Sequence, residues 1–345
     1  MSAQPGLPLR GGSGTFDPSI ERVRDPEWLP HYYDAEANAL SFARLPREAR
    51  QRLVFLDPRF VRGELSAMIA VSDLAVSYLA DAAQPLHFIF HVRFCCSTLL
   101  TRAFDLPGVA MGLKEPAILA FFKPDTPLAS LELALDLLSR PLAGERQIAK
   151  PSNSCNDLLG PILDVRPSSR AVLLHADLPS FVRAIARRRG EGRKFAQVLA
   201  ERFLPATALS APLLPDGDLR HAAVLWCAQM HLFRAALSRF GARRVRTLTT
   251  DALLAAPAEA IFNTAQFFEV DVSKAHAEAI AYGPVFRLHA KEYGVAFDAA
   301  AYHAQHAAAQ KLHAAEIDAV LAWCEDWAGT AEFALGDTLL AERVS

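Results

Sequence analysis

Residues 86–105, LHFIFHVRFCCSTLLTRAFD, decide the fold. The first six, Leu86–His91, are rich in apolar and aromatic side chains, which is typical of a strand buried in a parallel sheet. Four small residues follow at 95–98, and apolar residues then recur at 99, 100, 103 and 104, the spacing of one helical face. The stretch therefore predicts a strand, a tight loop and a helix, in that order.

A loop between a strand and a helix is a common anion site, because backbone N–H groups and the positive end of the helix surround it. Ser97 and Thr98 add hydroxyl donors at the first turn. The loop has no G-x-x-x-x-G-K-[ST] pattern, and Cys95 and Cys96 stand where glycine is expected. An ordinary turn capped by Ser97 is the alternative, and the loop alone leaves both interpretations open.

The segment FIFHVRFCCSTLLTR resembles the F-x-x-G-R-x-G-S-T-L-L-x-R loop of bacterial sulfotransferase-like proteins. In that family the loop holds the 5′-phosphosulfate end of 3′-phosphoadenosine-5′-phosphosulfate (PAPS). Four further segments resemble a bacterial subgroup with a paired-cysteine loop: WLPHYYD (28–34), KEP (114–116), KPSN (150–153) and GPVFRLHAK (283–291). The resemblance implies an α/β, three-layer P-loop fold and transfer of a sulfuryl group from PAPS to a hydroxyl or amine, without a metal.

Strands and helices alternate after the loop. The continuing α/β alternation predicts four more strands, at 109–113, 146–150, 171–175 and 244–249, with helices between them. About five mostly parallel strands with right-handed crossovers follow from this alternation. Roughly 65 residues between the fourth and fifth strands read as a helical insertion, at 194–203 and 219–240.

Three regions are expected along the chain. Residues 1–25 offer little apolar surface to bury, so we predict a disordered N-terminus. Residues 26–82 carry amphipathic patterns at 45–56 and 63–81, which predict a helical cap packed on the main domain. Residues 83–345 form the P-loop α/β domain.

Composition excludes several classes of protein. The chain has 345 residues, 52% of them hydrophobic, and a formal net charge of −2, so it can build a large core and does not look like a general nucleic-acid binder. Its five cysteines form no C-x-x-C pair, which suits a reducing cytoplasm. No signal-peptide pattern and no apolar run near the roughly 20 residues of a membrane span occur. We therefore expect a cytoplasmic protein, and the family resemblance implies a bacterial one that acts on a small-molecule or peptide acceptor.

Sulfuryl transfer needs a base for the acceptor proton and a cation near the leaving oxygen. Glu115 follows the second strand, where some members of the resembled family carry the base, although it could also pair with Lys114 or cap the next helix. His175, at the end of the fourth strand, is the second candidate base. Arg93 in the loop and Lys150 at the end of the third strand are the candidate cations.

The resemblance also implies donor-binding residues. The loop supplies Arg93, Phe94, Cys95, Cys96, Ser97 and Thr98, and Arg102 matches the family's arginine after the loop. For the 3′-phosphate the family carries R-D-P-x-x-x-x-x-S, but here Ala176 and Ala184 replace the Arg and the Ser. The missing charge could come from Arg183 and the nearby Arg187, Arg188 and Arg189, although a basic run is usually a solvated face. It could also come from Arg287, His289 and Lys291, which would share one side of an extended segment.

The altered residues keep other functions open. A nucleotide- or phosphate-binding protein that has lost transfer is the main alternative, and an NTP-dependent kinase would need a loop lysine and magnesium ligands. The cysteine pair could be reactive thiols at a helix N-terminus or small fillers of a tight loop. His303 and His306 are three residues apart, but without an H-E-x-x-H pattern a solvated helix face is favoured over a zinc site.

Overall fold

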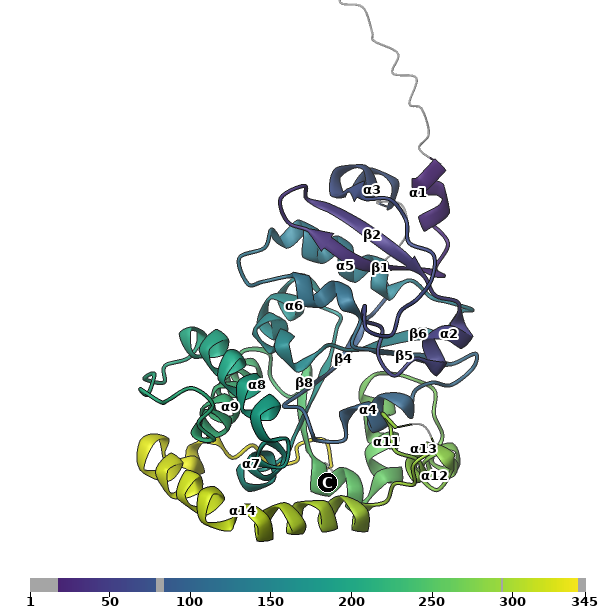
Figure 1. The fold of residues 1–345 in the computed structure, drawn as a ribbon. Coiled ribbons are helices and arrows are strands. Elements are labelled where there is room, and N and C mark those ends of the chain that lie inside the picture. The colour runs from purple at the N-terminus through teal and green to yellow at the C-terminus, as the bar shows by residue number, and fades with distance from the viewer. Residues whose placement is uncertain (1–17, 79–83, 293, 341–345) are drawn as a thin grey trace, which may run out of the picture.

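The computed structural model describes residues 18–78, 84–292 and 294–340. Five strands form one parallel sheet in the order β5-β6-β4-β7-β8 (Figure 1). Their bounds are β4 (His87–His91), β5 (Ala110–Lys114), β6 (Arg146–Lys150), β7 (Ala171–His175) and β8 (Val245–Thr249). All five predicted strands are confirmed to within one residue at each end. Strand β4, the first of these five in the sequence, thus lies in the middle of the sheet.

Helices cover both faces of this sheet. Figure 1 shows α5 (Leu128–Ser139) and α6 (Leu159–Val165) on one side, and α4 (Ser97–Arg102) and α11 (Pro257–Phe267) on the other. Every residue of β4, β5 and β7 is buried, as strands covered on both faces must be. The three-layer α/β fold is therefore confirmed.

The predicted helical insertion is present at the carboxyl ends of the strands. It contains α8 (Arg189–Phe203) and α9 (Arg220–Phe240), preceded by α7 (Leu178–Ala186) and crossed below by the long C-terminal helix α14 (Ala299–Ala328) (Figure 1). Trp226 and Met230 are buried there, and the Trp226 indole N–H donates to Ala176 O over 2.9 Å. The remaining elements of this domain are η1 (Ala117–Phe121), η2 (Asn153–Leu158), η3 (Leu204–Ala206), α10 (Thr250–Ala255), α12 (Lys274–Ala281), α13 (Pro284–Arg287) and η4 (Thr330–Phe333).

The N-terminal region differs from the prediction, because residues 26–82 are not an all-helical cap. They contain a three-stranded antiparallel sheet, β1 (Trp28–Asp34), β2 (Ala39–Arg44) and β3 (Ile69–Ala70), together with the short helices α2 (Arg47–Arg52) and α3 (Val71–Tyr78). The aromatic residues of β1 favour a strand, and Asn38 adopts a left-handed φ of 45° that closes the hairpin. The end of the predicted helix at 79–81 lies outside the described residues.

The predicted disorder of residues 1–25 is wrong in its last part. Residues 1–17 lie outside the described residues, but Pro18–Val23 form α1, and Val23 is fully buried. The Arg140 guanidinium donates to the Val23 carbonyl oxygen, which ties this helix to the main domain. Hydrophobic residues of both regions belong to one continuous core.

The loop after α2 matters for the site because it runs along the end of β5. Leu56 N–H donates to Lys114 O over 2.7 Å, and Ala117 N–H donates to Leu56 O over 3.0 Å. These bonds hold Phe55 and Arg59 beside the carboxyl edge of the sheet.

No helix in the described part of the chain combines the length and apolar character needed to cross a membrane.

Candidate functional site

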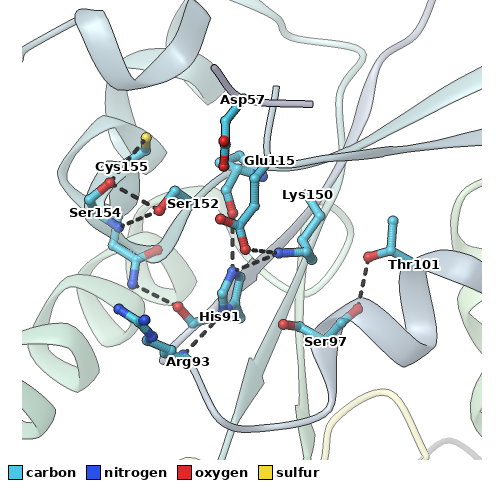
Figure 2. A network of polar contacts seen from close by, with 12 residues as sticks. Asp57, His91, Arg93, Ser97, Thr101, Glu115, Lys150, Ser152, Ser154 and Cys155 are labelled. Atoms are coloured by element: carbon cyan, nitrogen blue, oxygen red, sulfur yellow. Dashed lines mark hydrogen bonds and ion pairs between the residues drawn. The ribbon is translucent and has the colours of Figure 1, made fainter. Parts of the chain in front are cut away.

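Three neighbouring strands end in ionisable side chains at the same edge of the sheet. Lys150 is the last residue of β6, His91 is the last of β4, and Glu115 directly follows β5. The parallel register pairs Lys114 with Lys150, and Glu115 N–H donates to Lys150 O over 2.7 Å. Glu115 has a left-handed φ of 54°, a conformation that non-glycine residues rarely adopt. Topology alone therefore brings these three groups together (Figure 2).

Glu115 and Lys150 form a buried ion pair. Lys150 Nζ lies 2.6 Å from Glu115 Oε1, and the side-chain exposures are 0% for Lys150 and 14% for Glu115. Each charge compensates the desolvation of the other, so neither can be removed without leaving an unpaired charge inside the protein. Glu115 Oε2 accepts no hydrogen bond from any described residue. The second carboxylate oxygen is thus available to a ligand.

His91 links this pair to the loop. Its Nδ1 accepts the Arg93 backbone N–H over 3.0 Å, so Nε2 carries the proton and donates to Pro151 O over 3.1 Å. Lys150 Nζ lies 3.2 Å from the same Nε2. Burial, and next the charge of Lys150, hold the pKa of His91 well below its ordinary value, so the imidazole is neutral. Sequence analysis missed His91, although a polar residue ending an otherwise apolar strand was the available signal.

The loop itself is tightly turned. Arg93, Phe94 and Cys96 have positive φ values of 75°, 56° and 61°, in a region that favours glycine. Such conformations cost free energy and persist where the surrounding structure fixes them. Thr98, at the first turn of α4, is 3% exposed, and its Oγ1 has no hydrogen-bond partner in the described part of the chain. A buried hydroxyl without a partner beside a cavity is suited to a bound anion.

That cavity, which we call the loop cleft, measures about 250 Å³. The loop from Phe94 to Leu99 forms one wall, and Arg187, Lys291 and His306 line the others. The pKa of His306 is lowered to about 4, first by burial and then by the charges of Arg183 and Arg187. Ala184, at the family's serine position, also lines it. Cations therefore reach the loop from segments that are distant in sequence.

A second cavity, the carboxylate cleft, measures about 680 Å³ and contains Glu115 in its lining. Arg93 and the segment 152–154 line it as well. Phe94, Arg188 and Lys291 line both clefts, so the two cavities meet at the loop.

Two arginine side chains stack on aromatic rings where the two clefts meet. Arg93 Cζ lies 3.9 Å from the ring centroid of Phe195, and Arg188 Cζ lies 3.7 Å from that of Phe94. Burial, and next the neighbouring Arg187, lower the pKa of Arg188 to about 10. The pKa of Lys291 is lowered to about 8, first by desolvation and then by Lys150, although its side chain remains accessible from the clefts. These groups are crowded by like charge, which a bound anion would relieve.

Several candidate residues lie elsewhere. His175 lines a separate cavity of about 310 Å³ with Ala176 and Asp177, away from Glu115. Burial lowers the pKa of His175, and its Nε2 has no partner among the described residues. Arg102 ends α4 and lines neither cleft.

Only some of the basic residues expected at the 3′-phosphate lie beside the loop cleft. His289 and Lys291 line the loop cleft, whereas Arg287 is the last residue of helix α13 and does not line it. The expected extended segment is therefore broken before His289. Arg183 lies outside the lining and donates from Nε to Gln310 Oε1 over 2.9 Å. Arg187 and Arg188, from the same basic run, line the cleft instead.

The two loop cysteines are not set up as reactive thiolates. Cys95 is fully buried, burial raises its pKa, and burial raises the pKa of Cys96 to about 12. Both shifts oppose thiolate formation. No group of three or more potential metal ligands occurs in the described part, where His303 is exposed and His306 lines the loop cleft.

Comparison with protein-family models gives no match, and comparison with curated proteins gives none. Among solved structures, the chain is similar to the sulfotransferase domain from the curacin biosynthetic pathway, with 15% identity, 70% of this chain and 98% of that chain covered, and a TM-score of 0.41. It is also similar to sulfotransferase STF9 from Mycobacterium avium, with 11% identity, coverages of 70% and 81%, and a TM-score of 0.43. Sulfotransferase STF1 from Mycobacterium tuberculosis H37Rv shows 12% identity, coverages of 61% and 75%, and a TM-score of 0.40.

Proposed function

We propose that this protein transfers a sulfuryl group from PAPS to a hydroxyl or amine. The observation that carries the proposal is the meeting of two clefts at one strand–loop–helix turn. One cleft contains the hydroxyls of Ser97 and Thr98, and the other contains the Glu115 carboxylate. Donor and acceptor bound in these cavities would face each other beside Phe94 and Lys291. The resemblance of residues 88–102 to the phosphosulfate loop supports the same assignment.

In the proposed reaction the acceptor oxygen or nitrogen attacks the sulfur of PAPS. A new bond to sulfur forms, the bond between sulfur and the bridging phosphate oxygen breaks, and 3′,5′-adenosine bisphosphate leaves with the electron pair. Glu115 takes the acceptor proton, and Lys150 is a positioning residue that holds the carboxylate in place through their ion pair. Arg93 and Lys291 would stabilise negative charge on the transferred group.

The residues of the loop cleft fit the donor in their chemistry. The unpartnered Thr98 hydroxyl suits the phosphosulfate, and Arg187, His289 and Lys291 can supply the charge for the 3′-phosphate that Ala176 and Ala184 cannot. The same two alanines favour the alternative, a nucleotide-binding protein that no longer transfers.

Nucleotide selectivity separates the two functions. Wild-type protein should bind 3′,5′-adenosine bisphosphate at least about tenfold more tightly than AMP in isothermal titration calorimetry, a difference of roughly 1.4 kcal/mol. Replacing Arg187 and Lys291 together with Ala should remove most of that preference and spare AMP binding. Equal wild-type affinities for the two nucleotides would defeat the transferase proposal.

The base is tested by Glu115→Gln, which keeps the size of the side chain and removes its proton acceptor. The rate of sulfate transfer from labelled PAPS should fall about 10²–10⁴-fold, the usual contribution of a positioned base. Affinity for 3′,5′-adenosine bisphosphate should stay the same. Asp251→Asn, at the other end of the sheet edge, is the matched control and should keep wild-type turnover.

A further inference from the structure

The carboxylate cleft has more positive charge than the proposed transfer needs. Five basic residues line it, and Glu115 and Glu191 are the only acidic residues in the described part of its lining. The basic residues are Arg59, Arg93, Arg188, Lys194 and Lys291. Glu115 is already neutralised by Lys150. A cleft with this imbalance attracts anions and disfavours cations.

Most of these charges lack an acidic partner. Arg59 pairs with Asp57 over 2.6 Å. Within the described part of the chain, no carboxylate forms an ion pair at 4.0 Å or less with the other four. Arg93 and Arg188 rest on aromatic faces instead, which leaves their full charge to a ligand.

Lys194 has no task in the proposed transfer. Lys194 lines the carboxylate cleft but not the loop cleft. Lys291 and Arg188, in contrast, line both clefts, and Arg93 lies in the loop. Lys194 is exposed on α8 and forms no ion pair with a described residue. Its charge is therefore free for the part of the acceptor that points away from the reacting atoms.

The same helix gives the cleft an apolar wall. Four residues of α8 recur at helical spacing and line the cleft: Glu191, Lys194, Phe195 and Val198. The last two of them form the apolar surface. Val198 is 53% exposed although it is fully apolar. Phe55 lines the same cavity from the loop after α2. An acceptor with an aromatic or aliphatic body would cover this surface.

We propose that the acceptor is an amphipathic organic anion, such as a phenol that carries a carboxylate. Its hydroxyl would lie at Glu115, its apolar body against Phe195 and Val198, and its carboxylate at Lys194. This assignment of the acceptor class rests on the proposed function.

Three phenols that differ in one substituent test the charge preference. They are 4-hydroxyphenylacetate, its neutral amide 4-hydroxyphenylacetamide, and the cation tyramine, each titrated calorimetrically into the full-length protein with and without 3′,5′-adenosine bisphosphate. The anion should bind at least about tenfold more tightly than either of the others. Lys194→Glu should reduce this preference to less than about threefold, because it reverses one charge of the cleft.

Lys311→Glu is the matched control, since Lys311 is an exposed lysine of α14 that lines neither cleft. It should leave the preference unchanged. Equal affinity for the anion and the amide, no binding of the anion at millimolar concentration, or an equal loss in both lysine variants would each overturn the proposal. Transfer assays with the three phenols keep the two proposals apart. Selective anion binding without transfer would leave an anion-binding cleft and contradict the transferase proposal. Equal transfer to all three phenols would support the transferase and contradict the anionic acceptor.

Discussion

The two halves of the sheet's carboxyl edge have opposite character. On the β5-β6-β4 half, contacts of 2.6 and 3.2 Å join Lys150 to Glu115 and His91, and Glu115 lines an open cleft. On the β7-β8 half, His175 and Asp177 line a separate cavity whose described lining contains no lysine or arginine. Both halves follow from the same parallel topology. The difference between them is therefore a difference in side chains and loops, not in fold.

Parallel strands always deliver their last residues to one edge, so the edge offers several positions for a site. Among the described residues, the β5-β6-β4 half combines ionisable groups with the left-handed backbone conformations of Arg93, Phe94 and Glu115, and the β7-β8 half has no such conformation at its strand ends. In the second half an alanine stands where the resembled family has its arginine. The donor would then depend on cations from Arg187 and the segment 289–291, which reach the loop cleft from outside the sheet.

Removing the buried Lys150 cation, in the β5-β6-β4 half, should lower the free energy of unfolding more than any other change considered. Lys150→Met leaves Glu115 as an unpaired, largely buried carboxylate, and loss of one member of a buried pair costs about 3–5 kcal/mol of unfolding free energy. Urea denaturation followed by circular dichroism measures this. His175→Leu in the second half removes a neutral imidazole with an unpartnered Nε2 and should stay within about 1 kcal/mol of wild type. Equal losses of unfolding free energy in the two variants would contradict the difference between the two halves of the sheet edge.

Removing the loop hydroxyls should have the next largest effect. Ser97→Ala with Thr98→Ala deletes two donors to a charged group, each typically worth about 1.5–3 kcal/mol, so affinity for 3′,5′-adenosine bisphosphate should fall at least about a hundredfold. Calorimetric titration gives the value. Thr250→Val, at the start of α10 in the second half, removes a hydroxyl that donates to His175 O over 3.2 Å and should not change the affinity. Unchanged binding in a folded double variant rules out the loop as the phosphosulfate site.

The charge of Lys291 predicts a pH dependence of smaller size. Its pKa of about 8 means that the amine is protonated below this pH and neutral above it, so nucleotide affinity should weaken by up to about tenfold as the pH rises through this value. The charged groups around it are Lys150, Glu115 and Arg93. Lys291→Arg remains charged and should flatten the profile, whereas Lys311→Arg should leave it as in wild type. A wild-type affinity that is constant across this range contradicts the assigned role.

The smallest effect is expected at the loop cysteine. Cys96 occupies a left-handed conformation that glycine adopts without strain, so Cys96→Gly should keep nucleotide affinity within about threefold and shift stability by no more than about 1 kcal/mol. Cys96→Val should be clearly less stable, since a β-branched residue tolerates positive φ poorly. Loss of turnover in the glycine variant, with binding intact, would instead indicate thiol chemistry.

Sequence patterns located the sheet well and the N-terminal region poorly. The central strands β4 and β7 are mostly apolar runs, and the strand-then-helix alternation extends this local signal to the other three strands. Residues 63–81 have an apolar pattern that also fits a helix, and only pairing with β2 turns Ile69–Ala70 into a strand. His91 escaped notice because its role depends on neighbours far away in the chain. For the same reason the sequence did not show which arginine of the basic run at 183–189 lines the loop cleft.

What the sequence by itself determined is the strand–loop–helix unit around residues 86–105 and the α/β alternation after it, because both depend on local composition and periodicity. The tertiary structure decided which strand ends lie side by side, and hence that Glu115 meets Lys150 and that His175 meets neither. It also brought Lys291, Arg187 and α8 to the loop from distant parts of the chain. The physical reason is that register, burial and unpaired charge are properties of contacts between segments, and no single segment of sequence contains them.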